Sequence, residues 1–324
     1  MIAAPLRSPT SPTEDKELPY NITGKGYGKN GVKLLHVTRD GAYHSVQEFD
    51  IIVHIKLSGN KEYTEGENSA IIDSDVLKNI MCVVGKKQGI EGPEKFALLV
   101  ARKILEKYAH VVEISLNVET YPWRRISQDK VKPDGSTTNY QHNHAFMFTS
   151  TVQRYCEVIV RRQDAKPTVI SGFKGLRLLK TAKSTFMHFI QDEYTTTPYL
   201  HDRLLSTIAE GAWEYSDFEN VDFTKDWESV TDTVVKTFCG DPIDGTVSTS
   251  TQRASYLSIK QVLDDLPHIA VMSITLPNKP YIPFDMKPFQ KLVPGENNEI
   301  FIPIDKPYSI VYTQLSRKDL KSHY

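Results

Sequence analysis

The stretch Gly175-Leu-Arg-Leu-Leu-Lys-Thr-Ala-Lys-Ser-Thr-Phe186 marks the point at which a strand pattern changes to a helix pattern. We expect the helix to run from Thr185 to about Glu193, with an acidic and hydroxyl-rich turn between Phe186 and Arg203. An aromatic ring and a guanidinium on either side of such a turn suit a flat, anionic heterocycle. The same residues also fit an ordinary core and a surface arginine, so this stretch alone leaves both interpretations open.

Before this stretch, the apolar residues follow the two periods of an α+β protein. A strand over 32–39, a hairpin turn at Asp40-Gly41 and the alternating residues 49–57 predict a long hairpin with one apolar face. Helical spacing predicts helices over 73–84, with Asp73 and Ser74 as capping residues, and from Pro93 onward. Alternation returns over 112–119. A polar segment with a turn at 133–135 and a short apolar run, 145–148, follow it.

The second half repeats this order. We expect the following elements: strands at 155–162 and 168–180, helices at 185–193, 227–238 and 251–266, and strands at 269–276 and 309–315. The chain therefore predicts two α+β units, 21–150 and 151–324, after a tail, 1–20, that is rich in Pro, Ser and Thr and is expected to be disordered. Antiparallel sheets with helices on one face leave open edges, which closure into a barrel or pairing with another subunit would remove.

Composition excludes several classes of protein. The 324 residues are 40% hydrophobic and 24% charged, as expected for a soluble globular protein. The net charge of -1 gives no reason to expect nucleic acid or an anionic membrane as a partner. Three scattered cysteines are too few for a disulfide framework, which favours a reducing compartment. No apolar run approaches the length of a membrane span.

Three local patterns carry candidate chemistry, each with an ordinary structural alternative. His142 and His144 lie on the same side of a strand, a spacing that fits either two metal ligands or a hydrogen-bonded pair. Lys29 follows a glycine-containing loop and is either a solvated lysine or, if buried, a base. Ser74-Asp75, just past the apolar pair Ile71-Ile72, fits a helix cap on its local sequence alone.

Nine short motifs in the same order resemble urate oxidase (uricase), from about Gly24 to the C-terminus. They are Tyr27-Gly-Lys29, Asn68-Ser69, Leu77-Lys-Asn79, Tyr121-Pro-Trp-Arg124, His142-Asn-His144, Gly175-Leu-Arg-Leu-Leu-Lys180, Asp192-Glu-Tyr-Thr195, Leu276-Pro-Asn-Lys279 and Lys287-Pro-Phe-Gln-Lys291. The resemblance implies two tandem tunnelling-fold units whose sheets close into barrels between the subunits of a homotetramer. It also implies a cofactor-free and metal-free oxidation of urate by O2 and water to 5-hydroxyisourate and hydrogen peroxide.

The resemblance also implies the residues of the site. Lys29 and Ser74 match the proton-relay dyad, and Ser74 and Asp75 contact substrate and water. The substrate platform of the neighbouring subunit is implied at Phe186, Arg203, Thr251, Gln252 and Asn278. The phenylalanine stacks under the purine, the arginine and glutamine hold its edges, and the asparagine borders the place of oxygen or water.

Two positions of this implied site depart from the family pattern. Ser74 replaces a threonine, which keeps the hydroxyl but makes it freer at χ1. Pro280 replaces the histidine that completes the relay, and a proline side chain carries no proton. The sequence therefore favours a urate oxidase of reduced activity. The alternative is a catalytically impaired descendant that keeps the tetramer and purine binding.

The C-terminus is a weak match to the address that the resemblance implies. Relatives end in a peroxisomal tripeptide of the Ser-Lys-Leu type, whereas this chain ends Ser322-His323-Tyr324. The peroxisome remains the expected compartment by resemblance. Because Tyr324 is a poor substitute for leucine, we expect import to be weak or absent, and the cytoplasm is the alternative compartment.

Overall fold

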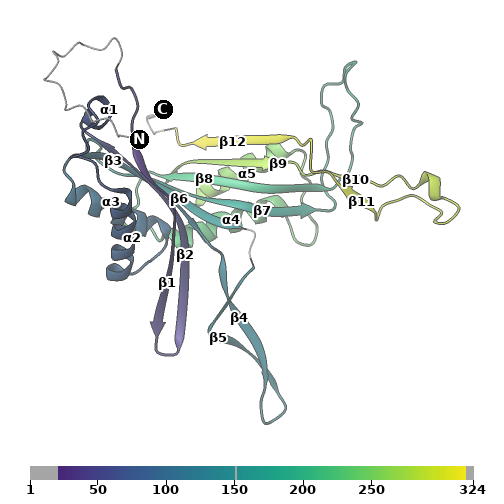
Figure 1. The fold of residues 1–324 in the computed structure, drawn as a ribbon. Coiled ribbons are helices and arrows are strands. Elements are labelled where there is room, and N and C mark those ends of the chain that lie inside the picture. Colours follow the sequence, from purple (N-terminus) through teal and green to yellow (C-terminus); the bar gives the residue numbers. More distant parts are fainter. Residues whose placement is uncertain (1–20, 150–151, 319–324) are drawn as a thin grey trace, which may run out of the picture.

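The computed structural model describes residues 21–149 and 152–318, so the expected tail, 1–20, and the tripeptide 322–324 lie outside the described residues. These residues form one eight-stranded sheet, four longer helices and two ribbons that project from the body (Figure 1). Every neighbouring pair of strands in the large sheet is antiparallel. Across the sheet the strands are β1 (Tyr27–Asp40), β2 (Tyr43–Leu57), β3 (Val111–Thr120), β6 (Gln153–Arg161), β7 (Thr168–Lys180), β8 (Leu205–Tyr215), β9 (Ile269–Pro277) and β12 (Ile310–Ser316).

One continuous apolar face of this sheet carries the core. The expected alternation in β2 is confirmed, since Phe49, Ile51, Val53, Ile55 and Leu57 are all buried. Strand registers carry the same face onward, because Val53 pairs with Leu116 on β3 and Leu116 pairs with Val158 on β6. In β3 the expected alternation holds from Ile114 to Val118, but a register shift opposite Lys56/Leu57 buries Val111 in place of Val112.

Four helices cover the apolar face in two pairs. They are α2 (Ser74–Gln88), α3 (Pro93–Lys107), α4 (Phe223–Cys239) and α5 (Thr251–Asp265), with short helical turns at α1 (Lys61–Thr64) and η1 (Lys287–Phe289). Of the expected capping residues, Asp73 is confirmed, because its side chain accepts from the Asp75 N–H at the start of α2, whereas Ser74 is the first residue of that helix. Pro93 opens α3 as expected. No helix in 21–149 or 152–318 is long and apolar enough to cross a membrane.

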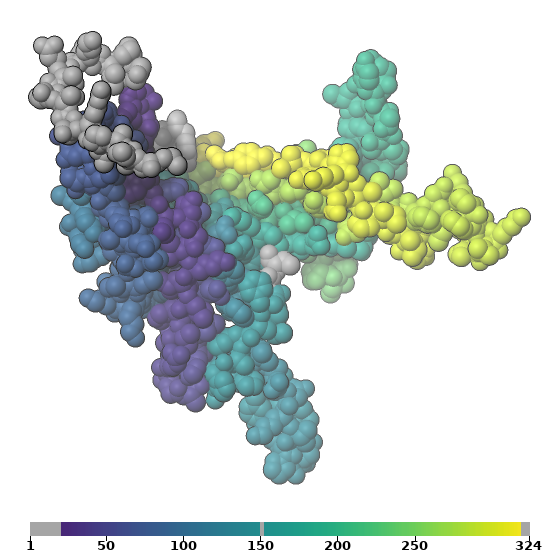
Figure 2. Space-filling model, viewed as in Figure 1, coloured from purple at the N-terminus to yellow at the C-terminus, as the bar shows by residue number. Residues whose placement is uncertain are grey.

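Two ribbons leave the sheet where the sequence predicted connections and, around His142 and His144, a single strand. The polar turn 133–135 is confirmed, but it joins two full strands, β4 (Trp123–Val131) and β5 (Thr137–Phe148). The proline-rich connection before β12 contains a shorter ribbon, β10 (Tyr281–Pro283) and β11 (Phe301–Pro303). In the space-filling view both ribbons stand clear of the body as projecting arms (Figure 2).

Two expectations about the second half are wrong. Residues 185–193 form no helix, because His188 adopts a φ of +59° and the Phe186 N–H and C=O pair with Leu200 in an isolated bridge. This segment is instead an extended strap, residues 181–204, between β7 and β8. β8 itself was not expected, although it lies inside the sheet between β7 and β9.

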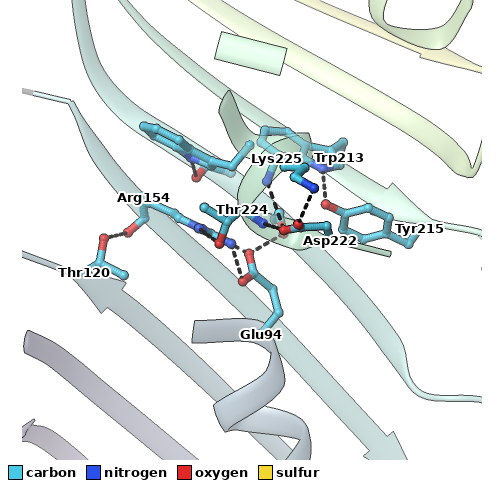
Figure 3. A network of polar contacts seen from close by, with 11 residues as sticks. Glu94, Thr120, Arg154, Trp213, Tyr215, Asp222, Thr224 and Lys225 are labelled. Carbon is cyan, nitrogen blue, oxygen red and sulfur yellow. Dashed lines mark hydrogen bonds and ion pairs between the residues drawn. The ribbon is translucent and has the colours of Figure 1, made fainter. Parts of the chain in front are cut away.

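A buried polar network joins the elements of the first half to those of the second (Figure 3). The Glu94 carboxylate on α3 is completely buried and accepts hydrogen bonds from Arg154 on β6 and from Ser171 on β7. Arg154 also donates to Thr224 on α4 at 3.2 Å. Because a buried carboxylate without partners is costly, this network holds the two helix pairs in one arrangement.

Candidate functional site

Lys29 and Ser74, which the family resemblance pairs as a relay, lie close together in the first half. The Lys29 ammonium on β1 is 3.4 Å from the Ser74 hydroxyl, which opens α2. Its shorter contact is an ion pair of 2.8 Å with the carboxylate of Asp75. The hydrogen bond from Lys29, with a second from Lys78, lowers the pKa of Asp75. The structure thus adds a charged partner to the expected pair of lysine and hydroxyl.

Phe186 and Arg203 lie together at the two ends of the strap. The Arg203 guanidinium carbon is 5.1 Å from the centre of the Phe186 ring, which also stacks on Phe189 with centroids 4.6 Å apart. The carboxylate of Asp202 accepts from the backbone N–H groups of Ser184 at 3.1 Å and of Arg203 at 3.0 Å. One carboxylate therefore fixes the backbone of both ends of the strap.

Arg203 is a partly buried cation without a carboxylate partner among the described residues. Burial lowers the pKa of its guanidinium, and its Nε is buried without a hydrogen bond. Two other buried side-chain atoms in the described residues also lack partners: the hydroxyl oxygens of Ser184, on the strap, and Thr207, just after it. Because such groups are costly when unpaired, three of them in one region indicate a place for a polar ligand or for water.

The first turn of α5 is held beside the strap. Ser184 forms an isolated parallel bridge with Ser248, in which the Thr185 N–H donates to the Ser248 C=O at 2.9 Å. Ser250 caps the helix, and its hydroxyl accepts from the Arg253 N–H. The two expected platform residues open the helix: Thr251 is buried and Gln252 is exposed.

Asn278 completes the group at the same end of the sheet. It leaves β9 and pairs with Thr207 of β8 in an isolated antiparallel bridge, four residues after Arg203. The next residue is held to the same strand, since the Lys279 N–H donates to the Ser206 C=O at 2.9 Å. Pro280 then turns toward the β10–β11 ribbon, where its carbonyl accepts from the Ile304 N–H.

Within one chain the two groups are separated. Lys29, Ser74 and Asp75 lie at the β1 edge, whereas the platform lies at β8 and β9. β8 is five steps from β1 in the sheet, and adjacent strands are spaced by about 4.8 Å, so the separation along the sheet is roughly 24 Å. A single purine cannot touch both groups of one chain across such a span.

His142 and His144 lie on the β5 arm, away from both groups. Their ring centroids are 5.4 Å apart in an edge-to-face arrangement, and the His144 ring lies 6.1 Å from that of His44 on β2. Residues 21–149 and 152–318 contain no group of three or more His, Cys, Asp or Glu side chains that could hold a metal ion.

Sequence reasoning missed Ser184, Asp202 and Thr207, which the structure places around the platform. Ser184 lies two residues before Phe186 and Asp202 lies directly before Arg203, so their positions were visible in the sequence. Their role was not, because it depends on a strap conformation that brings residues 184 and 202 together.

Comparisons with known proteins agree over almost the whole chain. A profile of the family described as Uricase matches residues 25–159 and 169–312. Curated uricases of Drosophila virilis and Drosophila pseudoobscura pseudoobscura are 51% and 48% identical, each alignment covering all of both chains. The rabbit (Oryctolagus cuniculus) uricase is 38% identical, over 94% of this chain and 98% of its own. The crystal structure of the uricase from Arthrobacter globiformis superposes with a TM-score of 0.82 at 26% identity, covering 94% of this chain and 98% of that one.

Proposed function

This chain belongs to the uricase family, and we propose that it oxidises urate with O2 and water to 5-hydroxyisourate and hydrogen peroxide, without a metal or organic cofactor. Electron-rich urate is itself the reductant in this reaction. The protein then has to deprotonate urate, hold it flat, seat oxygen beside it and deliver water.

The observation that carries the proposal is Arg203 with its unpaired, partly buried guanidinium beside the Phe186 ring. In this assignment the purine anion stacks on Phe186 and pairs with Arg203, and Gln252 binds another edge. Thr251 borders the pocket, and Asn278 holds oxygen or water. Ser74 and Lys29 move protons, with Ser74 and Asp75 contacting substrate and water.

We propose that each site is completed by two subunits of a homotetramer. The roughly 24 Å along the sheet between the two groups of one chain supports this, because a neighbour can supply the missing half. The edge strands β1 and β12 are unpaired on their outer sides in the described chain, as expected of sheets that join between subunits into barrels.

Two units, each with the element order of a tunnelling fold, are part of the same proposal. Strand-strand-helix-helix-strand-strand occurs as β1, β2, α2, α3, β3, β6 and again as β7, β8, α4, α5, β9, β12. In each case a ribbon is inserted before the last strand. In this proposal the junction lies at 162–167, between β6 and β7, later than the division at 150 and 151 expected from the sequence.

Replacing Arg203 by alanine tests the platform. We expect urate affinity, measured by calorimetry without oxygen so that no urate is consumed, to fall by about a hundredfold or more because a charged hydrogen-bond pair is lost. Arg102→Ala, on the outer face of α3, is the matched control and should bind as the original protein does. Unchanged affinity in Arg203→Ala would refute the assignment.

Pro280 sets the level of activity that we propose. The missing relay histidine reduces the rate, while Lys29 and Ser74 still pass protons through water, since general acid-base groups contribute about two to four powers of ten. Pro280→His should therefore increase the rate at which urate's ultraviolet absorbance is lost, with an equal increase in the rate of peroxide release. If neither protein turns over urate, the catalytically impaired alternative is correct.

We propose a peroxisomal location, because the proposed reaction releases hydrogen peroxide. The whole chain fused to a fluorescent protein at its N-terminus should colocalise with a peroxisomal marker, and an even distribution through the cytoplasm would contradict the proposal.

A further inference from the structure

Lys180 is the last residue of the motif Gly175–Lys180, and the proposed reaction does not use it. It ends β7 opposite Leu205 of β8, and its side chain is half-buried. The ammonium donates to the Ser248 hydroxyl at 3.1 Å and to the Thr246 carbonyl. It forms no ion pair with a carboxylate in the described part of the chain, and burial lowers its pKa.

The segment 246–248, to which Lys180 donates its hydrogen bonds, leads directly into α5. The Thr246 hydroxyl accepts from the Asp241 N–H at 3.1 Å, and the Ser248 N–H donates to the Lys183 carbonyl at 2.9 Å. Two residues after Ser248 comes the cap Ser250, and Thr251 and Gln252 follow it. The orientation of Gln252 therefore depends on where Ser248 is held.

The same segment is tied to the strap that carries Phe186. The Thr185 N–H donates to the Ser248 carbonyl, so the bridge between Ser184 and Ser248 sets the distance between the Phe186 backbone and the start of α5. Lys180 fixes one side of this bridge from the end of β7, and the Asp202 carboxylate fixes the other through the Ser184 N–H.

We infer that Lys180 is a positioning residue for the substrate platform. Lys180 holds the segment 246–248 so that Gln252 faces the purine stacked on Phe186. Lys180 does not touch the substrate. This inference rests on the proposed urate oxidation for its kinetic consequences, whereas its structural consequence, an ordered segment 246–252, stands independently of the reaction. Burying a cation is costly unless it is hydrogen-bonded, and both acceptors of the Lys180 ammonium lie in this segment, so its burial is favourable only while the segment stays in place.

The test compares Lys180→Met with Lys260→Met, which removes one lysine charge from the exposed surface of α5 itself, where Lys260 pairs with Asp264. Lys180→Met should raise KM for urate by about tenfold or more, with a smaller fall in kcat, because misplaced binding groups weaken substrate binding. Amide hydrogen exchange over 246–252 should accelerate. Lys180→Arg, which keeps a charged donor, should show a smaller rise in KM than Lys180→Met. Ser248→Ala should also raise KM, but by less than Lys180→Met does.

Each outcome decides one claim. Unchanged exchange over 246–252 and unchanged KM in Lys180→Met would overturn the positioning role. If the unaltered protein neither binds nor oxidises urate, the proposed function is refuted. Faster exchange in Lys180→Met would in that case still support the role of Lys180 in ordering the segment. If Lys180→Met does not fold, Ser248→Ala carries the test, and faster exchange at 246–252 with a raised KM is the supporting result.

Discussion

Replacing Arg154 by methionine removes the cation from the buried network between the two halves of the chain. Arg154 contacts the Glu94 carboxylate at 2.7 Å, and the exposed fractions of the two side chains are 11% and 0%. Without the guanidinium, Glu94 keeps only the Ser171 hydroxyl as a donor among the contacts described above, at 2.6 Å. Because an unpaired buried charge is strongly unfavourable, we expect the free energy of unfolding to fall by about 3–5 kcal/mol.

Two further variants separate this effect from the loss of an arginine in general. Arg161→Met is the matched control on the same strand, since Arg161 pairs with Glu113 at 2.6 Å but its side chain is 35% exposed. We expect it to lose about 1 kcal/mol or less, as surface pairs do. In Glu94→Gln/Arg154→Met both charges are absent, and the free energy of unfolding should return to within about 1–2 kcal/mol of the original value.

Urea unfolding monitored by tryptophan fluorescence measures these differences, because Trp213 is buried within the same network. The proteins must be compared at one concentration, since association adds to apparent stability. The reasoning fails if Arg154→Met loses no more than Arg161→Met, or if the double variant is as unstable as Arg154→Met alone.

Three further predictions follow from single contacts. Burial, and then the charge of Glu210, raises the pKa of Tyr155 from 10.0 to about 12. The stability that the buried, protonated Tyr155 contributes is therefore complete below pH 10 and lost as pH rises toward about 12. Alkaline unfolding monitored by phenolate absorbance would test this. Gly172→Ala would place a Cβ atom 2.3 Å from the Tyr155 ring, so the melting temperature should fall by several degrees, and an unchanged melting temperature would contradict this packing. Ser74→Thr should raise the initial rate of urate oxidation modestly and Ser74→Ala should lower it, whereas equal rates in all three proteins would remove Ser74 from the relay.

The elements that the sequence predicted well are those with large, regularly spaced apolar side chains. β2 buries a valine, a phenylalanine, two isoleucines and a leucine at alternate positions, and α2 begins at the expected capping residues. The sequence pattern did not predict β8 because the buried face of this strand includes small residues. Gly211 on that face leaves room for the Phe173 ring of β7, which would lie 2.5 Å from a Cβ atom there, so no bulky apolar residue marks the strand at that point.

The strap shows the opposite error, because apolar residues at helical spacing form no helix. Ile190 belongs to that apparent stripe but is 86% exposed, while Phe186 and Phe189 pack on each other across an extended backbone. The candidate site was predictable to the extent that Lys29 and Ser74, and Phe186 and Arg203, do lie near one another. The ion pair of Lys29 with Asp75 and the unpaired atoms around Arg203 depend on side-chain placement, which sequence spacing does not determine.

The separation of the two groups along the sheet has a genetic consequence. If each site is shared by two subunits as proposed, a chain with Lys29→Met lacks only the relay half of any site it joins, and a chain with Arg203→Met lacks only the platform half. When the two defective chains assemble at random in equal amounts, about a quarter of the sites pair an intact relay half with an intact platform half. Two alleles that are each inactive alone would then complement one another in the same cell, provided that both chains enter one assembly.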